Sequence, residues 1–169
     1  MLPSIKNILY TTDLSKNASF AFRYAMTLGK ELDAKIIILY VLPMVDSAME
    51  VPIITQMGEE MYYKLRKEKS KEIIESIKKR LQDFSQKELE DAQCKPESVS
   101  SILVREGDEV DEILKAADTL KSDIIVIGTH GKGILSHTFL GTVPDKLLRR
   151  SRVPVFVVPI PKHATDSDL

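Results

Sequence analysis

Five short apolar runs, separated by longer segments of helical character, constrain the fold of this chain more than any other feature of its sequence. Alternation of this kind is typical of successive strand–helix units that feed a parallel sheet. Three of the runs are almost continuously apolar, as strands are when helices cover both faces of their sheet. The sequence therefore predicts an α/β fold with strands at Asn7–Thr11, Lys35–Val41, Val99–Val104, Asp123–Ile127 and Val153–Val158.

The segments between these strands differ in their periodicity. Apolar residues recur at helical spacing from Ala18 to Leu32, with Ser15 as the expected N-cap, and Asp108–Leu120 has acids in its first turn followed by one apolar face. The Lys- and Glu-rich region Met57–Asp91 predicts one long or broken helix with a solvated outer face. Leu42–Gln56 has two prolines and no sustained period, which predicts a mobile loop over the site.

Charge and cysteine content exclude several classes of protein. The 24 basic and 25 acidic residues nearly balance, so no long-range field attracts nucleic acid or an anionic membrane. Cys94 is the single cysteine, which excludes an internal disulfide and a cysteine-rich metal site. The first residues do not have the design of a signal peptide, and no apolar run approaches the roughly 20 residues of a membrane span. We expect a cytoplasmic protein with one domain over residues 1–160 and a polar tail over 161–169.

The stretch GTHGKGILSHTFLGT, residues 128–142, holds four of the seven glycines of the chain. It leaves the fourth predicted strand at its carboxyl end, where ligands bind in open parallel sheets. Glycines permit positive φ there and let backbone N–H groups approach an anion. Gly141, Thr142 and Val143 begin the next helical segment, whose first amides and hydroxyl are directed at the same place. The stretch therefore predicts a phosphate-binding site.

Two better-known phosphate motifs do not fit this stretch. A P-loop needs four residues between its first glycine and a Gly-Lys-Ser/Thr triplet, and here Lys132 is followed by Gly133. A dinucleotide fingerprint needs a third glycine where this chain has Ser136. What remains is Gly128, two residues, Gly131, nine residues and Gly141-Thr142, together with DLS after the first strand and VPVFVVP near the end. With these patterns the sequence resembles the ATP-binding branch of the universal stress protein family. The resemblance covers nearly the whole chain.

The resemblance implies a single open five-stranded parallel sheet in the order 3-2-1-4-5, of the kind found in adenine-nucleotide alpha hydrolases. The point at which the strand order reverses would lie between the first and fourth strands, and Asp13 and Gly128 would flank it. The Asp13 carboxylate would accept from ribose hydroxyls, the Val41 backbone would read the adenine edge, and Gly128 would lie near the ribose and first phosphate. Thr12 and Ile127 are implied as wall positions.

The phosphate contacts that the resemblance implies are backbone amides of Gly131, Gly141, Thr142 and Val143, with the Thr142 hydroxyl. His130 stands between two glycines, where it either touches a phosphate or is an exposed turn histidine. No carboxylate pair for a metal is visible near the motif, so Mg²⁺ or Mn²⁺ would be held through the phosphates and water.

Each of these positions also has a simpler interpretation. Asp13 is equally suited to cap the first helix, Gly128 and Gly131 to be turn glycines, and Thr142 to be an N-cap without a ligand. The positive charges near the motif attract phosphates or follow a solvated helix end; they are Lys132, Arg149, Arg150 and Arg152. His137 and His163 have no companions at metal-ligand spacing, so we expect no metal site there.

Three functions fit these residues. The first is a regulatory module whose ATP occupancy is read by an unknown protein partner; the second is a slow ATPase or adenine-nucleotide hydrolase. Amide donors can be assigned but no convincing base, which favours binding over turnover. The third is a family member that acts by protein contact alone, against which the intact glycine spacing argues.

The last predicted strand suggests how two copies would pair. It lies at the sheet edge, where unpaired backbone groups and an apolar face invite another chain. Pro154 and Pro159 bracket it and limit that pairing to a few residues. The family pairs this strand across a two-fold axis, which implies a homodimer; the alternative is a protected edge on a monomer. The residues of this expected interface are Val153, Val155, Phe156, Val157 and Val158.

Overall fold

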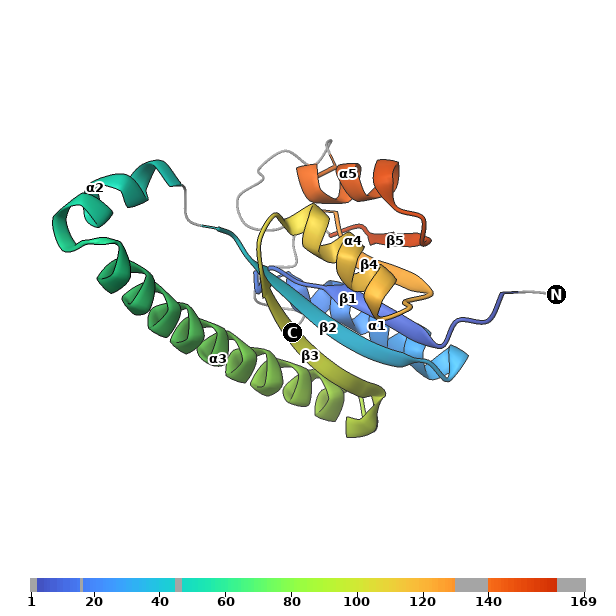
Figure 1. Ribbon diagram of the computed structural model, residues 1–169. Coiled ribbons are helices and arrows are strands. Elements are labelled where there is room, and N and C mark those ends of the chain that lie inside the picture. The colour runs from blue at the N-terminus through green and yellow to red at the C-terminus, as the bar shows by residue number, and fades with distance from the viewer. Residues whose placement is uncertain (1–2, 16, 45–46, 130–139, 161–169) are drawn as a thin grey trace.

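The computed structural model describes residues 3–15, 17–44, 47–129 and 140–160 and has a five-stranded parallel sheet between two layers of helices (Figure 1). The strand order is β3-β2-β1-β4-β5, as the resemblance implied. The strands are β1 Asn7–Thr11, β2 Lys35–Leu42, β3 Val99–Glu106, β4 Ile124–Gly128 and β5 Val155–Val158. The helices are α1 Ala18–Leu32, α2 Ser47–Met57, α3 Glu59–Asp91, α4 Glu109–Thr119 and α5 Thr142–Arg150, with a 3₁₀ turn η1 at Pro96–Ser98.

All five predicted strands are confirmed, with some ends shifted by one or two residues. Asp123 lies before β4 because its carboxylate accepts from the backbone N–H groups of Lys6 and Asn7, both at 2.8 Å, and so braces the chain entering β1. β5 begins after Pro154, which has no N–H for the ladder and offers only its carbonyl, to Ile125 N at 2.9 Å.

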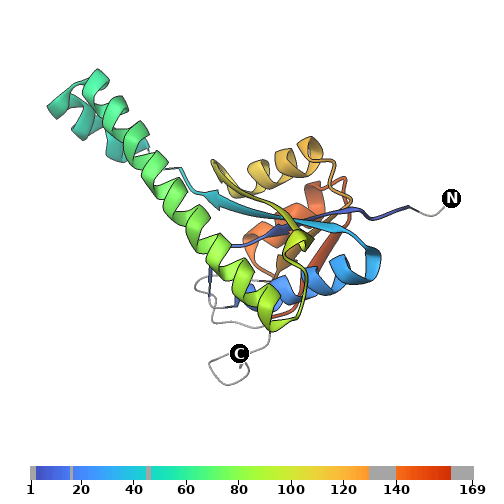
Figure 2. The same cartoon turned by 90° about the horizontal axis from the view of Figure 1, so that it is seen from below.

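Helices cover both faces of the sheet (Figure 2), and each face carries a separate hydrophobic core. Side chains alternate along β1, so that Ile8 and Tyr10 pack under α1 and α3, whereas Leu9 packs under α4 and α5. All three side chains are fully buried. Coverage on both faces explains why the central strands are apolar without a break.

The start of α1 differs from the prediction. Asn17, not Ser15, occupies the N-cap position, and no side chain caps the helix. The Ser15 carbonyl instead accepts from Ala18 N at 3.0 Å. The predicted helix over Ala18–Leu32 is confirmed, and the buried Phe22 and Met26 confirm its apolar face.

The prediction of a loop over Leu42–Gln56 is wrong for most of this segment, because Ser47–Met57 forms helix α2. The helix contains Pro52, which removes one N–H from its interior. A contact across the chain supports it: Arg66 of α3 forms an ion pair with Glu50 at 2.6 Å. Gly58 then reverses the chain with φ of 84°, in the region that favours glycine. Tertiary contact therefore overrides the irregular local pattern.

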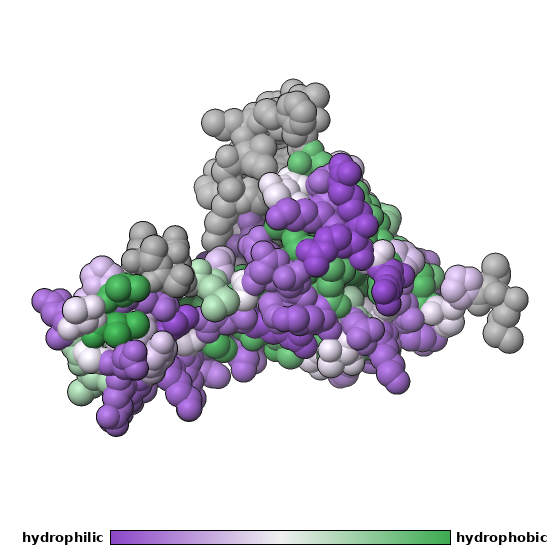
Figure 3. Space-filling view, turned by 45° about the horizontal axis from the view of Figure 1, so that its top comes forward, coloured by the Kyte–Doolittle hydropathy of each residue, from purple (hydrophilic) through white to green (hydrophobic). Residues whose placement is uncertain are grey.

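Helix α3 is one continuous helix of 33 residues, which decides between the long and broken forms predicted for Met57–Asp91. Its second half buries Ile77 and Leu81 against the sheet, whereas its first half projects away with α2 as an arm (Figures 1 and 2). Apolar side chains such as Met61 stay exposed there, and hydrophobic surface gathers at the far end of the arm (Figure 3). None of the helices in the described ranges has the length and apolar character needed to cross a bilayer.

Candidate functional site

A cavity of about 350 Å³ opens at the carboxyl ends of the central strands β1 and β4. These two strands are neighbours in the sheet, but their crossovers lead to opposite edges, towards β2 and towards β5. The chain therefore diverges at this point and leaves a crevice. Of the ten predicted site positions, eight line the cavity: Thr12, Asp13, Val41, Ile127, Gly128, Gly141, Thr142 and Val143. His130 and Gly131 lie outside the described residues, as do Lys132, His137 and His163.

The turn after β1 fixes the position of Asp13. One oxygen of its carboxylate accepts from Ser15 N at 2.9 Å, and the Thr12 hydroxyl accepts from Leu14 N at 3.1 Å. Leu14 has φ of 56°, which this pair of side-chain bonds helps to hold. Asp13 therefore stabilises the turn that precedes α1, although it is not the N-cap of that helix. Its side chain remains in the wall of the cavity.

The end of β2 presents backbone polar groups to the cavity. The Leu39 carbonyl accepts from Thr12 N at 3.0 Å, so Leu39 directs its polar groups towards β1. Polar groups alternate sides along a strand, so those of Val41, two residues on, also face β1. The ladder with β1 ends at the pair of Thr11 with Leu39. The Val41 backbone groups therefore lie beyond the β1 ladder, at a residue that lines the cavity.

The opposite wall of the cavity is the amino end of α5. Gly141 is the N-cap, so the alternative of Thr142 as N-cap is wrong; Thr142 is the first residue of the helix. The Gly141 N–H donates to Thr129 O at 2.8 Å, and Pro144 has no N–H. The amides of Thr142 and Val143 are therefore the two at this helix start that have no carbonyl partner within the helix. They leave a partial positive charge at this end.

Glu109 lines the cavity from α4 and was not predicted as a site residue. It is half-buried, and burial raises the pKa of its carboxyl, with further contributions from the negative charges of Asp13 and Asp108. The pKa of Tyr40, also in the wall, is raised by burial and then by Asp13 and Glu109. The acids at the start of Asp108–Leu120 were interpreted only as favourable for the helix dipole. Because β3 pairs with β2, the helix that follows β3 begins beside the cavity. The strand order was therefore the feature that could have identified Glu109.

Thr11 is a second cavity residue that sequence reasoning missed. It is 7 % exposed, and its hydroxyl has no hydrogen-bond partner among the described residues. Because it follows Tyr10, its side chain lies on the α4 and α5 face of the sheet. A buried hydroxyl without a partner is unfavourable for the ligand-free fold.

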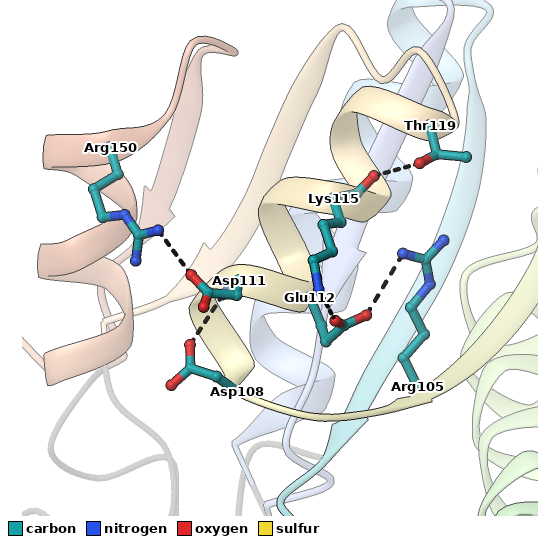
Figure 4. A network of polar contacts seen from close by, with 7 residues as sticks. All are labelled: Arg105, Asp108, Asp111, Glu112, Lys115, Thr119 and Arg150. Atoms are coloured by element: carbon teal, nitrogen blue, oxygen red, sulfur yellow. Dashed lines mark hydrogen bonds and ion pairs between the residues drawn. The ribbon is translucent and has the colours of Figure 1, made fainter.

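Charged side chains outside the cavity tie α4 to its neighbours (Figure 4). Arg150 of α5 contacts Asp111 of α4 at 2.7 Å, and Arg149 bonds Asp145 one turn away on its own helix. These arginines do not line the cavity. This agrees with the second interpretation of these charges, in which they follow a solvated helix end and do not attract phosphates. In the described parts of the chain, no three His, Cys, Asp or Glu side chains are grouped so that they could hold a metal ion.

Comparison with known proteins agrees with this geometry. The model of the universal stress protein family matches residues 4–159. Universal stress protein MJ0531 of Methanocaldococcus jannaschii is 30 % identical over 157 residues, covering 93 % of this chain and 84 % of that protein. Universal stress protein MJ0577 of the same organism is also 30 % identical, over 164 residues that cover 90 % of this chain and 94 % of that protein. The solved structure of MJ0577 superposes with a TM-score of 0.61 over 93 % of this chain and 97 % of that one. The chain therefore belongs to the universal stress protein family.

Proposed function

We propose that the cavity binds ATP and that the protein is a nucleotide-dependent regulatory module. The observation that carries the proposal is the division of the cavity into two chemically different ends. Carboxylates and the Val41 backbone line one end, and the open amino terminus of α5 lines the other. A nucleotide has the matching division, since its base and ribose offer hydrogen-bond donors and its phosphates carry negative charge.

The two ends orient the proposed ligand. The amides of Thr142 and Val143 and the Thr142 hydroxyl would donate to the phosphates. The Asp13 carboxylate would accept from the ribose hydroxyls, and Val41 would meet the adenine edge. Gly128, at the end of β4, lines the cavity, and its lack of a side chain would leave room for the ribose. Mg²⁺ or Mn²⁺ would be held through the phosphates, where its charge offsets theirs.

Solved structures of the same fold indicate that it accommodates adenine nucleotides. One universal stress protein was solved in complex with cAMP, at 20 % identity and a TM-score of 0.56. An Arabidopsis thaliana protein of the family was solved with AMP bound, at 17 % identity and a TM-score of 0.56. At these identities the likeness concerns the fold, so the assignment to this chain depends on its own cavity.

The test is calorimetric titration of ATP with Mg²⁺ into nucleotide-stripped protein, beside two variants of one residue. Thr142→Ala removes the hydroxyl and keeps the amide, whereas Thr142→Pro removes both. Proline suits the first position of a helix, and Gly141 already has the extended ψ of 157° that a residue before proline prefers. We expect a small loss of affinity in Thr142→Ala and a loss of about 10- to 100-fold in Thr142→Pro.

A folded, stripped parent that does not bind ATP would refute the nucleotide assignment and favour action by protein contact alone. The same samples, followed for ADP, separate a regulator from a slow hydrolase. A regulator retains ATP over many hours, and steady release of ADP at a rate proportional to protein concentration would assign turnover instead.

The proposal includes a homodimer formed through β5. This strand is at the sheet edge, and Phe156 keeps 36 % of its surface exposed. Sedimentation equilibrium is expected to give a dimer for the parent and a monomer for Phe156→Glu. Leu65→Glu, an equally drastic change on the exposed arm, is the control and is expected to stay dimeric. A monomer in Leu65→Glu alone would move the interface to the arm.

A further inference from the structure

Two side chains in one wall of the cavity are unfavourable in the ligand-free protein. The Thr11 hydroxyl is buried without a partner among the described residues, and the Glu109 carboxyl is half-buried beside Asp13 and Asp108. Groups that destabilise a fold and gather in a cleft are typical of binding sites, because a ligand compensates them. Neither group belongs to the glycine motif.

Both groups lie on the same side of the sheet. Thr11 has its side chain on the face covered by α4 and α5, and Glu109 is the first residue of α4. Ile113, one turn further along α4, also lines the cavity and gives this wall an apolar floor. The wall therefore combines an apolar surface with the Glu109 carboxylate, a composition suited to a flat heteroaromatic ring. The Thr11 hydroxyl is covered in the ligand-free protein and joins this surface when its side chain rotates towards a ligand.

The backbone places Glu109 near the end of β2. Gly107 N donates to Leu42 O at 3.0 Å, which holds the β3–α4 connection against the strand that carries Val41. Glu109 follows Gly107 by two residues, so its backbone lies near the end of β2, and it lines the same cavity as Val41. The phosphate-binding end, at the start of α5, belongs to another crossover.

We propose that Glu109 and Thr11 form a polar subsite for the nucleobase, in which the Glu109 carboxylate accepts a hydrogen bond from an exocyclic amino group. The inference rests on the proposed nucleotide binding and adds base selectivity to it. Adenine carries an amino group at its 6-position, whereas hypoxanthine carries a carbonyl oxygen there. A carboxylate accepts from the first and repels the second, so Glu109 selects adenine over 6-oxo purines.

The experiment compares ATP and inosine triphosphate, each with Mg²⁺, by calorimetric titration of the full chain. We expect the parent to prefer ATP by at least about tenfold, because an acceptor-only side chain left facing a carbonyl has no partner. In Glu109→Gln, whose amide can donate to the carbonyl, we expect this ratio to fall at least about fivefold. Asp118→Asn, an exposed acid of the same helix, is the control and is expected to keep the parent ratio.

A second variant keeps the test independent of Glu109. Thr11→Val preserves the shape of the side chain and removes the hydroxyl. We expect its ATP affinity to fall about three- to tenfold while the melting temperature of the ligand-free protein does not fall. A purely structural hydroxyl would give the reverse, with unchanged affinity and lower stability, and this result would remove Thr11 from the subsite.

The outcomes distinguish this inference from the proposed function. If the parent binds ATP, and Glu109→Gln keeps the parent ratio, the subsite is overturned and nucleotide binding stands. If the parent binds ATP and inosine triphosphate equally, the subsite is again overturned. If the folded parent binds neither nucleotide, the proposed function fails first and the subsite with it.

Discussion

The helices α4 and α5 begin at the same cavity, and their amino ends are used in opposite ways. Helix α4 is capped by its own acid, since Asp108 accepts from Asp111 N at 3.0 Å, and its first turn holds three further carboxylates. Helix α5 has Gly141 at its N-cap, no side-chain cap, and one first-turn acid, Asp145, that pairs with Arg149. Among the described residues, the amino end of α4 is therefore satisfied by the chain itself, whereas the amino end of α5 has free amides that suit an anion.

The difference between the two helix ends determines which end of the cavity would hold the phosphates of the proposed ligand. A phosphate at the α4 end would meet Glu109 and Asp108, whereas at the α5 end it would meet amides. Both helices follow a strand and pack on the same face of the sheet. The residues at their N-caps therefore determine whether the helix end suits an anion. Substitutions at the two caps, and at the residues that hold them, can test this difference.

The first prediction concerns what holds the open end of α5 in place. Leu147 is fully buried between this helix and the sheet, whereas its neighbour Leu148 is 51 % exposed. We expect Leu147→Ala to lower the free energy of unfolding by about 2–5 kcal/mol because it leaves a cavity. Leu148→Ala is the control and is expected to change it by less than about 0.5 kcal/mol. Chemical denaturation measures both, and equal effects would mean that α5 is not anchored by this side chain.

The second prediction converts the α5 end into a copy of the α4 end. Gly141 has φ of −60° and ψ of 157°, in the same extended region as the −70° and 129° of Asp108, so an aspartate can adopt the N-cap backbone at this position. The new carboxylate would cap α5, and because Gly141 is buried, thermal unfolding of the variant must first show that it stays folded. The carboxylate would also repel phosphate and occupy the amides, and we expect ATP affinity to fall by about 30- to 100-fold. Gly141→Ser, a cap without charge, is expected to lose less, and equal losses in the two variants would contradict a phosphate at this end.

The third prediction removes the self-capping of α4. Asp108→Ala deletes the acceptor for Asp111 N, and we expect it to lower the free energy of unfolding by about 1 kcal/mol. Thermal unfolding of Asp108→Asn, which keeps an acceptor, is expected to remain close to the parent. If Asp108→Ala were as stable as the parent, the Asp108 cap would contribute little and the α4 end would not be satisfied by the chain.

The sequence predicted the sheet and most of the cavity for a physical reason. Strands covered on both faces must be apolar, and glycines are rare enough in this chain that their spacing carries information. Eight of the ten predicted positions line one cavity because strand ends in a parallel sheet converge at one edge. These features are local in sequence or fixed by the fold class.

The features that were missed depend on contacts between distant segments. Helix α2 is supported by the ion pair of Glu50 with Arg66, which no local pattern around Pro52 reveals. Thr11 looked like an ordinary strand residue, since its missing partner is visible only once the surroundings are known. Glu109 looked like a first-turn acid, and its position at the cavity follows from the pairing of β3 with β2.

The smallest expected effect concerns pH, and it separates the two ends of the cavity by their charge. The pKa of Glu109 is raised in the folded protein by burial and by Asp13 and Asp108, and the pKa of Tyr40, which lines the same cavity, is raised by burial and then by Asp13 and Glu109. A raised carboxyl pKa means that the folded state holds the proton more tightly than the unfolded state does. Glu109 therefore lowers stability at neutral pH, and this cost disappears as the pH falls through its folded pKa.

We expect Glu109→Gln to melt at a higher temperature than the parent at neutral pH, with a difference that shrinks towards zero as the solution is acidified. Asp118→Asn, on the same helix but exposed, is expected to show no such pH-dependent gain. Thermal unfolding without nucleotide measures both variants. A Glu109→Gln protein that is less stable than the parent at neutral pH would mean that the carboxylate has a stabilising partner, and the α4 end would then need no ligand to compensate it.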